Sequence, residues 1–186
     1  MVTRLEPDEI PDETLRAYAS KQKDRSVFYR IALAVNFRPA RSETFVDAGV
    51  GLRLDHDGSA DVPPPIARSL DPLRLSGSST RRTTTGVVAN IAVGQARAER
   101  TTESPDGRAY LVAAGDGRCD PAWSFDGSAG HELRGIYPLT MVAEAPAGPH
   151  SVALLAASAT IRRPVAGFLR CRAALPRELE IIDLGG

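Results

Sequence analysis

Cysteine and aromatic residues are scarce in this sequence. Only two of its 186 residues are cysteines, and Phe, Trp and Tyr together make up 5%. A disulfide framework of the kind that holds small secreted domains together therefore cannot organise the fold. Cys119 and Cys171 are expected to be free thiols in the cytosol, and to be able to pair only if the chain is exported. With so few rings, the core has to be built mostly from Val, Leu, Ile and Ala.

An excess of charge of either sign is also missing. The chain has 23 acidic and 23 basic residues and a formal net charge of zero. General nucleic-acid binders and membrane-surface binders carry a strong positive excess, so the composition argues against both. Lys21 and Lys23 are the only lysines, and the other basic residues are arginines. Together with abundant Ala, Gly and Pro, this favours a bacterial-like, GC-rich coding bias over arginines selected to bind phosphate.

Long hydrophobic runs are absent as well. The longest apolar stretch, residues 152–161, is about half as long as the roughly 18 residues that a membrane-spanning helix needs. The first residues lack the apolar region of a secretory signal. The sequence therefore predicts a cytoplasmic protein without a membrane span.

What the sequence does contain is an alternation of apolar and polar residues with a period of two. It is clearest at residues 27–37 and 46–54, and it returns at 87–98, 108–114, 133–141, 151–163, 168–173 and 178–184. A change of phase at Gly94-Gln95 indicates a β-bulge, and Pro105-Asp106-Gly107 is typical of a hairpin turn. Seven to nine strands without helices between them predict an all-β, antiparallel two-sheet sandwich or flattened barrel.

The first 25 residues follow a different pattern. Leu15, Tyr18 and Ala19 have helical spacing behind Pro11 and two acids, which predicts a short helix over about residues 12–21 after a flexible tail. We interpret this helix as a cap on the β domain rather than a docking element for a partner. The expected organisation is a tail and helix at 1–25 and one β-sandwich domain at 26–186.

Acidic residues gather in two turns and suggest a weak metal site. Carboxylates alternate around a glycine at residues 55–61, and two more lie in the Asp- and Gly-rich connection 115–131. If strands 27–37 and 46–54 form a hairpin, and strand 108–114 pairs with 87–93, all of these carboxylates meet at one end of the sandwich. They could then bind calcium through oxygen ligands, with nearby arginines as the metal-free alternative. The candidate ligands are Asp55, Asp57, Asp61, Asp116 and Asp120.

The same connection offers a weak ligand site. Trp123 and Phe125 beside Arg118 resemble the aromatic platforms that bind sugars or lipid headgroups. The alternative is that Trp123 plugs the core, because large aromatic side chains usually contribute buried area. With so few aromatic residues available, we favour the core plug.

Catalytic signatures are weak. Ser128 and His131 share one loop, but the spacing and the missing helix do not fit a nucleophile elbow. His56, His131 and His150 are far apart in sequence, which disfavours zinc. No phosphate-binding glycine loop occurs, and Arg81 and Arg82 in a Ser/Thr-rich run are best explained as a solvated loop. Whether the protein is an enzyme is uncertain, and a hydrolase ranks last.

These observations leave three functional hypotheses. The first is a non-catalytic binding or assembly module that acts through protein-protein contacts, with a protein partner or self-association and no cofactor. The second is a ligand-binding sandwich for a carbohydrate, a lipid headgroup or a divalent cation. A hydrolase is the third.

Overall fold

The computed structural model describes residues 1–77, 108–128, 131–166 and 169–185. These residues form eleven strands, one α-helix and one short 3-10 helix. In chain order the elements are β1 (Val2–Leu5), the 3-10 helix (Pro7–Glu9), α1 (Glu13–Gln22), β2 (Ser26–Phe37), β3 (Thr44–His56), β4 (Ile66–Asp71), β5 (Arg74–Ser76), β6 (Ala109–Ala114), β7 (Ala122–Asp126), β8 (Gly135–Pro146), β9 (Ser151–Ala166), β10 (Leu169–Ala174) and β11 (Glu178–Asp183). The predictions for 87–98, for the turn at 103–107, and for Arg81 and Arg82 lie outside the described residues.

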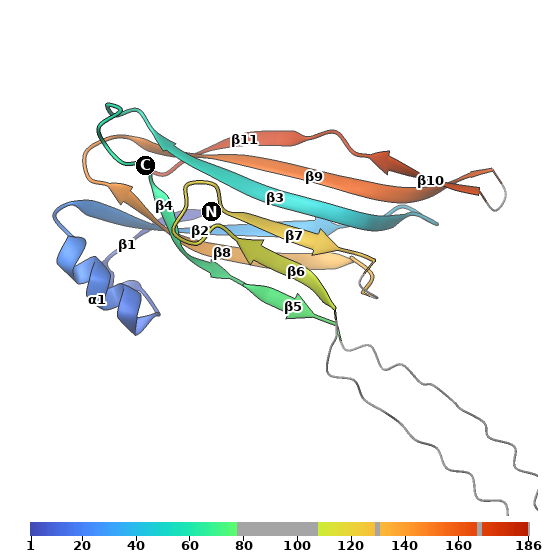
Figure 1. The fold of residues 1–186 in the computed structure, drawn as a ribbon, viewed down its shortest axis with the longest axis horizontal. Coiled ribbons are helices and arrows are strands. Elements are labelled where there is room, and N and C mark those ends of the chain that lie inside the picture. The colour runs from blue at the N-terminus through green and yellow to red at the C-terminus, as the bar shows by residue number, and fades with distance from the viewer. Residues whose placement is uncertain (78–107, 129–130, 167–168, 186) are drawn as a thin grey trace, which may run out of the picture.

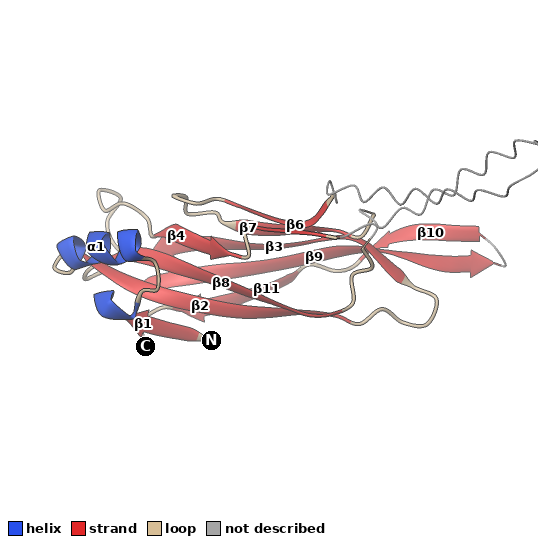
Figure 2. Ribbon diagram, turned by 90° about the horizontal axis from the view of Figure 1, so that it is seen from below, coloured by secondary structure: helices blue, strands red, loops and turns tan. Residues whose placement is uncertain are grey.

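The strands form two antiparallel sheets that face each other (Figures 1 and 2). The four-stranded sheet has the order β1-β2-β8-β4. The seven-stranded sheet has the order β10-β9-β3-β7-β6-β5, with β11 also paired to β9. The predicted all-β, antiparallel sandwich is confirmed, although the described strands outnumber the seven to nine expected.

The hairpin expected between the first two long strands does not form. β2 pairs with β8 along its whole length, from Ser26 opposite Pro146 to Phe37 opposite Gly135. β3 instead lies in the other sheet, between β9 and β7. The chain crosses between the sheets at residues 38–43, where Pro39 cannot continue the ladder of β2.

The connection 115–131 also differs from its prediction as one long loop. It contains β7, which pairs with β3 on one side and β6 on the other. Trp123 and Phe125 alternate with polar neighbours and point inward. Two large buried aromatic side chains in a five-residue strand give it enough apolar contact to hold a central position in the sheet.

The core between the sheets takes residues from both layers. The four-stranded sheet contributes Ile31, Leu70, Leu139 and Met141, and the seven-stranded sheet contributes Leu52, Leu54, Leu111, Trp123, Phe125 and Ala153. Phe37 packs edge-on against Phe45, Phe125 and Tyr137, with ring centroids 4.9 to 5.5 Å apart. Four aromatic side chains therefore form one group in the core, around which most of the other core residues are aliphatic.

The N-terminal segment is more ordered than its prediction as a flexible tail. β1 pairs with β2, with Val2 opposite Ile31 and Leu5 opposite Phe28. Asp12 caps α1 by accepting a hydrogen bond from the Leu15 N–H at 2.7 Å. β1 was not predicted, because four residues are too few to show an alternation of apolar and polar side chains. The domain boundary at residue 25 stays a prediction.

α1 covers the outer face of the four-stranded sheet, as the capping interpretation predicts. Its Ala19 is buried in a small cluster with Leu5, Ile10, Phe28 and Val142. This second core is separate from the one between the sheets, and it ties the N-terminal segment to β2 and β8.

A polar network beside this cluster also holds α1 in place. The Glu144 carboxylate accepts hydrogen bonds from Arg68 Nε at 2.5 Å and from Ser26 Oγ at 2.7 Å. Arg68 Nη2 donates to Tyr18 Oη at 2.8 Å, and the guanidinium lies 4.8 Å from the centre of the Tyr18 ring. The network therefore joins α1, β2, β4 and β8 through one partly buried ion pair.

Two glycines in the turn between β6 and β7 give a matched test of backbone strain. Gly115 and Gly117 both have positive φ, at 101° and 72°. A Cβ on Gly115 would lie 2.6 Å from Pro121 Cα, whereas a Cβ on Gly117 meets nothing within 4 Å. We expect Gly117→Ala to lower the free energy of unfolding by about 1 kcal/mol. Gly115→Ala should cost at least about twice as much, measured by urea denaturation. Equal losses would show that the turn relaxes around the added methyl group.

Candidate protein-binding surface

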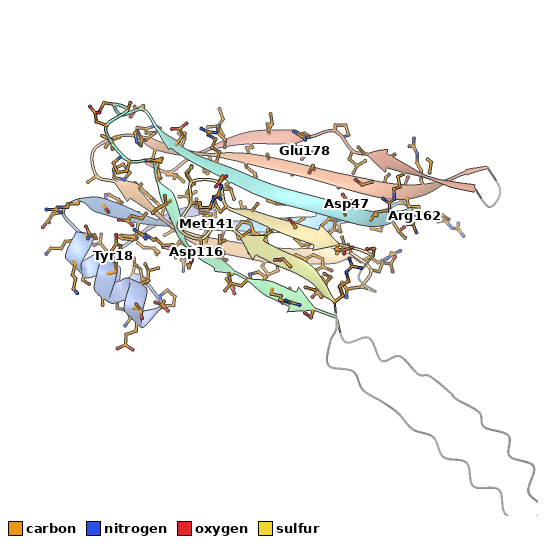
Figure 3. The ribbon with its side chains drawn as sticks, viewed as in Figure 1. Tyr18, Asp47, Asp116, Met141, Arg162 and Glu178 are labelled. Carbon is orange, nitrogen blue, oxygen red and sulfur yellow. The ribbon has the colours of Figure 1, made fainter. Side chains whose placement is uncertain are left out.

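The outer edge of the seven-stranded sheet is made by two strands placed end to end along β9. β10 pairs with residues 160–166 of β9, and β11 pairs with residues 152–157. Between them, Leu175 N–H still donates to Ala159 O at 2.8 Å, and Pro176 lies in the short connection. Figure 3 shows Glu178 at the start of β11 on this edge, far from Tyr18 on α1.

Large apolar side chains on the outer face of this edge are exposed. Leu179 and Ile181 of β11 are 78% and 72% exposed, and Leu154 of β9 is 38% exposed. Ile181 lies directly opposite Leu154, and Leu179 lies opposite Ala156, so all three large side chains share one face. We call Leu154, Leu179 and Ile181 the β11 patch.

Polar residues border the β11 patch on the same face. Arg53 of β3 lies opposite Leu154, and Asp55 lies opposite Val152. Asp183 follows Ile181 on the outer face of β11, because side chains two residues apart share a face. An apolar centre with a charged border is the usual composition of a protein interface.

A groove opens between the sheets on the same side of the sandwich. It has a volume of about 420 Å³. Its walls come from the end of β2, from β3, from β9 and from the connection that leads into β11, and they include Val35, Phe37, Phe45, Ala48, Val50, Ala157, Ala159, Leu175 and Glu178. We call this the seam groove. Its lining is mostly apolar, and Glu178 places a carboxylate at its border.

The turns that carry the predicted metal ligands lie at one end of the sandwich, but the structure does not bring the ligands together. Leu54 N–H donates to Cys119 O at 2.7 Å, so the turn after β6 lies beside the end of β3. The segments 55–57 and 116–120 are therefore at the same end of the sandwich, as expected. Among the residues that the structure describes, no three His, Cys, Asp or Glu side chains come together as metal ligands. A calcium site at Asp55, Asp57, Asp61, Asp116 and Asp120 stays a prediction.

Three of these carboxylates already have partners, and Asp55 accepts a hydrogen bond from the His56 N–H at 2.9 Å. Asp120 accepts two hydrogen bonds from Arg118, at 2.7 and 2.8 Å, and this contact lowers the pKa of Asp120. Asp57 accepts a hydrogen bond from the His150 N–H at 2.9 Å. This is the metal-free arrangement considered from the sequence, in which an arginine offsets the acidic charge.

Asp183 at the end of β11 forms a similar local contact. The Gly185 N–H donates to it at 2.7 Å and His150 Nε2 lies 2.9 Å away, and these contacts lower the pKa of Asp183. A carboxyl whose pKa is lower in the folded state adds stability above its unfolded pKa and loses that stability as the pH falls through its folded pKa. The contacts that Asp183 makes at the end of β11 should therefore stabilise the fold less as the pH falls through the lowered pKa of Asp183.

The aromatic side chains of the predicted ligand platform are buried. Trp123 is 0% exposed, and its Nε1 donates to Pro72 O at 3.2 Å. Phe125 is 2% exposed, whereas Arg118 is exposed and pairs with Asp120. Trp123 is therefore the core plug that the sequence analysis favoured, and the two rings do not form an exposed platform. Ligand binding by the surrounding turns stays a prediction.

The loop with Ser128 and His131 does not bring these two side chains into contact with each other. Ser128 Oγ donates to Asp126 at 2.5 Å, and this bond lowers the pKa of Asp126. His131 Nε2 lies 3.0 Å from Tyr137 Oη, and its ring stacks on Tyr110. Ser128 therefore contacts the end of β7, and His131 contacts β6 and β8. Cys119 and Cys171 are both free.

The β11 patch and the seam groove were both missed from the sequence. In residues 178–183, acidic and aliphatic residues alternate, as in a strand with its aliphatic face buried. The structure has the opposite orientation, because Leu179 and Ile181 point away from the core. Alternation shows which residues share a face, but not which face is covered.

Comparisons with other proteins add little to this description. Within the described residues, no helix has the length and apolar character needed to cross a membrane; the cytoplasmic location stays a prediction. No family model and no curated protein matches the chain. Among solved structures, domains D2 and D3 of the major pilin SpaD from Corynebacterium diphtheriae align over 83% of this chain and 46% of the pilin chain, at 7% identity and a TM-score of 0.27. The chain thus spans less than half of that structure, and a similarity of this size carries no argument about function.

Proposed function

We propose that this protein is a non-catalytic binding or assembly module that makes protein-protein contacts through the β11 patch. The observation that carries the proposal is the exposure of Leu179 and Ile181 beside Leu154 on one face of a sheet edge. Fully burying one such side chain contributes about 1.5 to 3 kcal/mol. Three adjacent side chains can therefore supply a substantial part of the free energy of a contact.

The edge of β11 is built to resist unspecific strand pairing, which favours contact through its face. Glu178, Glu180 and Asp183 place three carboxylates along six residues, and Pro176 interrupts the strand direction just before them. Charged residues and proline are the common means of blocking edge-to-edge aggregation. Of these three carboxylates only Asp183 lies on the outer face, where the large side chains of β11 are aliphatic and exposed. A partner protein, or a second copy of the chain, would cover this face.

The test compares Ile181→Lys and Leu179→Lys with Ile136→Lys. Ile136 is 66% exposed but lies at the start of β8 in the other sheet, so it is a matched control. If the partner is a second copy, sedimentation should show self-association that weakens by about tenfold or more in the two β11 variants. The Ile136→Lys variant should associate like the wild type.

A different partner requires a second readout. Cross-linking in extracts of the natural host should then give a bound protein that is retained by wild type and Ile136→Lys and lost with Ile181→Lys. Monomers at every concentration, together with identical cross-linked products for all three proteins, would contradict the proposal. Thermal unfolding of each variant checks that the fold is kept.

A further inference from the structure

The outer face of the seven-stranded sheet is exposed well beyond the β11 patch. Side chains of β9 alternate between the two faces, so Ile161 is buried in the core while Ser158 and Arg162 are exposed. On β3, Asp47 and Arg53 are exposed in the same way. Four neighbouring strands over about ten residues give this face an area of about 650 Å². That area approaches the roughly 800 Å² that each partner contributes to a standard protein interface.

The centre of this face is lined by small residues around a shallow hollow of about 220 Å³. These small residues are Gly49, Gly51, Ala122, Ser124, Ala156 and Ser158. A Cβ added to Gly51 would lie 3.8 Å from the Cβ of Ala122, an ordinary contact, so packing within the sheet does not require a glycine there. Glycine inside a strand often marks a place where another backbone approaches closely. The hollow therefore leaves room for a second surface at the middle of the face.

Charges on this face lie symmetrically about Ala157, in the middle of β9. Asp47 of β3 lies opposite Thr160, three residues to one side of Ala157. Arg53 of β3 lies opposite Leu154, three residues to the other side. An acidic and a basic side chain therefore lie at equal distances from the same centre.

The two ends of the face carry a second set of opposite charges. Arg172 of β10 lies opposite Arg162 of β9, five residues beyond the centre. Asp183 of β11 and Asp55 of β3 both lie opposite Val152, five residues to the other side. Figure 3 shows Arg162 at the end of the sheet that also carries Asp47. The face is thus basic at one end of β9 and acidic at the other.

We propose that this face binds a second copy of the chain, face to face, about a two-fold axis that passes by Ala157 parallel to the sheet and perpendicular to the strands. This rotation reverses the strand direction, so Asp47 of each copy meets Arg53 of the other. It also brings Arg172 of each copy to Asp183 of the other. This inference rests on the proposed binding function and names its partner as a second copy.

The same arrangement covers the β11 patch. Leu154 and Ile181 lie three residues to one side of the centre, and Thr160 and Ala174 lie three residues to the other side. The rotation therefore places the large aliphatic side chains of one copy over the smaller side chains of the other. Every contact occurs twice in a two-fold interface, so both copies bury their patches and pair their charges.

The pair of Asp47 and Arg53 is the best place to test the arrangement. Packed sheets cross by about 30°, so the side chains closest to the axis are displaced least from their expected partners. Asp47 and Arg53 are each about 10 Å from the axis along the strand. The charges at the ends of the face are farther away.

The experiment compares Asp47→Arg, Arg53→Asp and the double variant by sedimentation equilibrium. Each single variant places like charges opposite each other twice, so self-association should weaken by about tenfold or more. The double variant exchanges the charges and should recover the affinity of the wild type to within about threefold. An equimolar mixture of the two single variants should recover it as well, because a heterodimer pairs arginine with aspartate at both places.

Arg30→Asp is the matched control, because Arg30 is exposed on the outer face of the other sheet. It should associate like the wild type. Gly51→Arg is a second probe that does not depend on the charge pairs. It places a guanidinium of each copy in the hollow beside the axis, where the two repel, and it should also weaken self-association by about tenfold or more. Thermal unfolding of each variant checks that the fold is kept.

Two outcomes would overturn the inference. One is a wild-type protein that stays monomeric at concentrations on the order of 1 mM. The other is a mixture or a double variant that associates no better than the folded single variants. If Ile181→Lys abolishes binding of a different protein, or abolishes self-association that the charge reversals leave unchanged, the proposed function stands and only this arrangement is wrong.

Discussion

Replacing Leu139 with aspartate is expected to unfold the protein at room temperature. Leu139 is 0% exposed and lies opposite Leu33 in the central pair of the four-stranded sheet. The substitution removes a buried aliphatic side chain and leaves a carboxylate without a partner among Met141, Ile31 and the facing sheet. The two effects together should cost about 5 kcal/mol or more, which is comparable with the whole stability of an ordinary domain.

The control for this prediction lies on the neighbouring strand. Arg30 is exposed and adjacent to Ile31, which is 0% exposed, so the two positions differ mainly in the face they occupy. We expect Ile31→Asp to behave like Leu139→Asp and Arg30→Asp to change the free energy of unfolding by less than about 1 kcal/mol. Urea denaturation followed by the fluorescence of buried Trp123 measures all three. Similar losses at Arg30 and Ile31 would mean that the face assignment of β2 is wrong.

Replacing Glu144 with alanine is expected to loosen α1 from the sheet. The Glu144 side chain is 11% exposed and the Arg68 side chain is 30% exposed, so the ion pair is only partly screened by water. Removal of the carboxylate leaves Arg68 Nε and the Ser26 hydroxyl without their acceptor, while Arg68 Nη2 keeps Tyr18 Oη. We expect a loss of about 2 to 3 kcal/mol, because hydrogen bonds to a charged group are lost and a partly buried cation remains.

A double-mutant cycle separates the pair from its surroundings. Arg68→Met keeps much of the packing on Tyr18 while removing the charge, and it should rescue part of the loss caused by Glu144→Ala. The coupling between the two positions should be about 1 to 2 kcal/mol. Hydrogen exchange of the α1 amides should quicken in Glu144→Ala and recover partly in the double variant. Additive losses with unchanged exchange in α1 would show that the network does not hold the helix.

The long strands could be predicted because their pattern is local. β2 and β3 show the period of two over most of their length, and α1 shows its helical spacing behind Pro11. β1 and β7 were missed because strands of four or five residues contain too few alternations to distinguish them from loops. Their positions depend on the longer strands beside them, with which they pair.

The candidate site could not be predicted in the same way. The sequence already places the segments 55–57 and 116–120 in turns. Their position at one end of the sandwich was expected from a hairpin between β2 and β3, and the structure has this position although that hairpin does not form. The exposure of Leu179 and Ile181 depends on which side of β9 the last strand takes and on what faces it. These are relations between segments far apart in the chain, and no local pattern contains them.

The amino-acid sequence by itself therefore determined the class of the fold, the two long strands and the capping helix, because apolar periodicity and helix capping act between neighbours in the chain. Only the tertiary structure decided that β2 and β3 belong to different sheets, that Trp123 lies on a paired strand rather than in a loop, and that the aliphatic face of β11 is exposed. The physical reason is that burial and strand pairing depend on which surfaces meet, and that is set by packing of the whole chain.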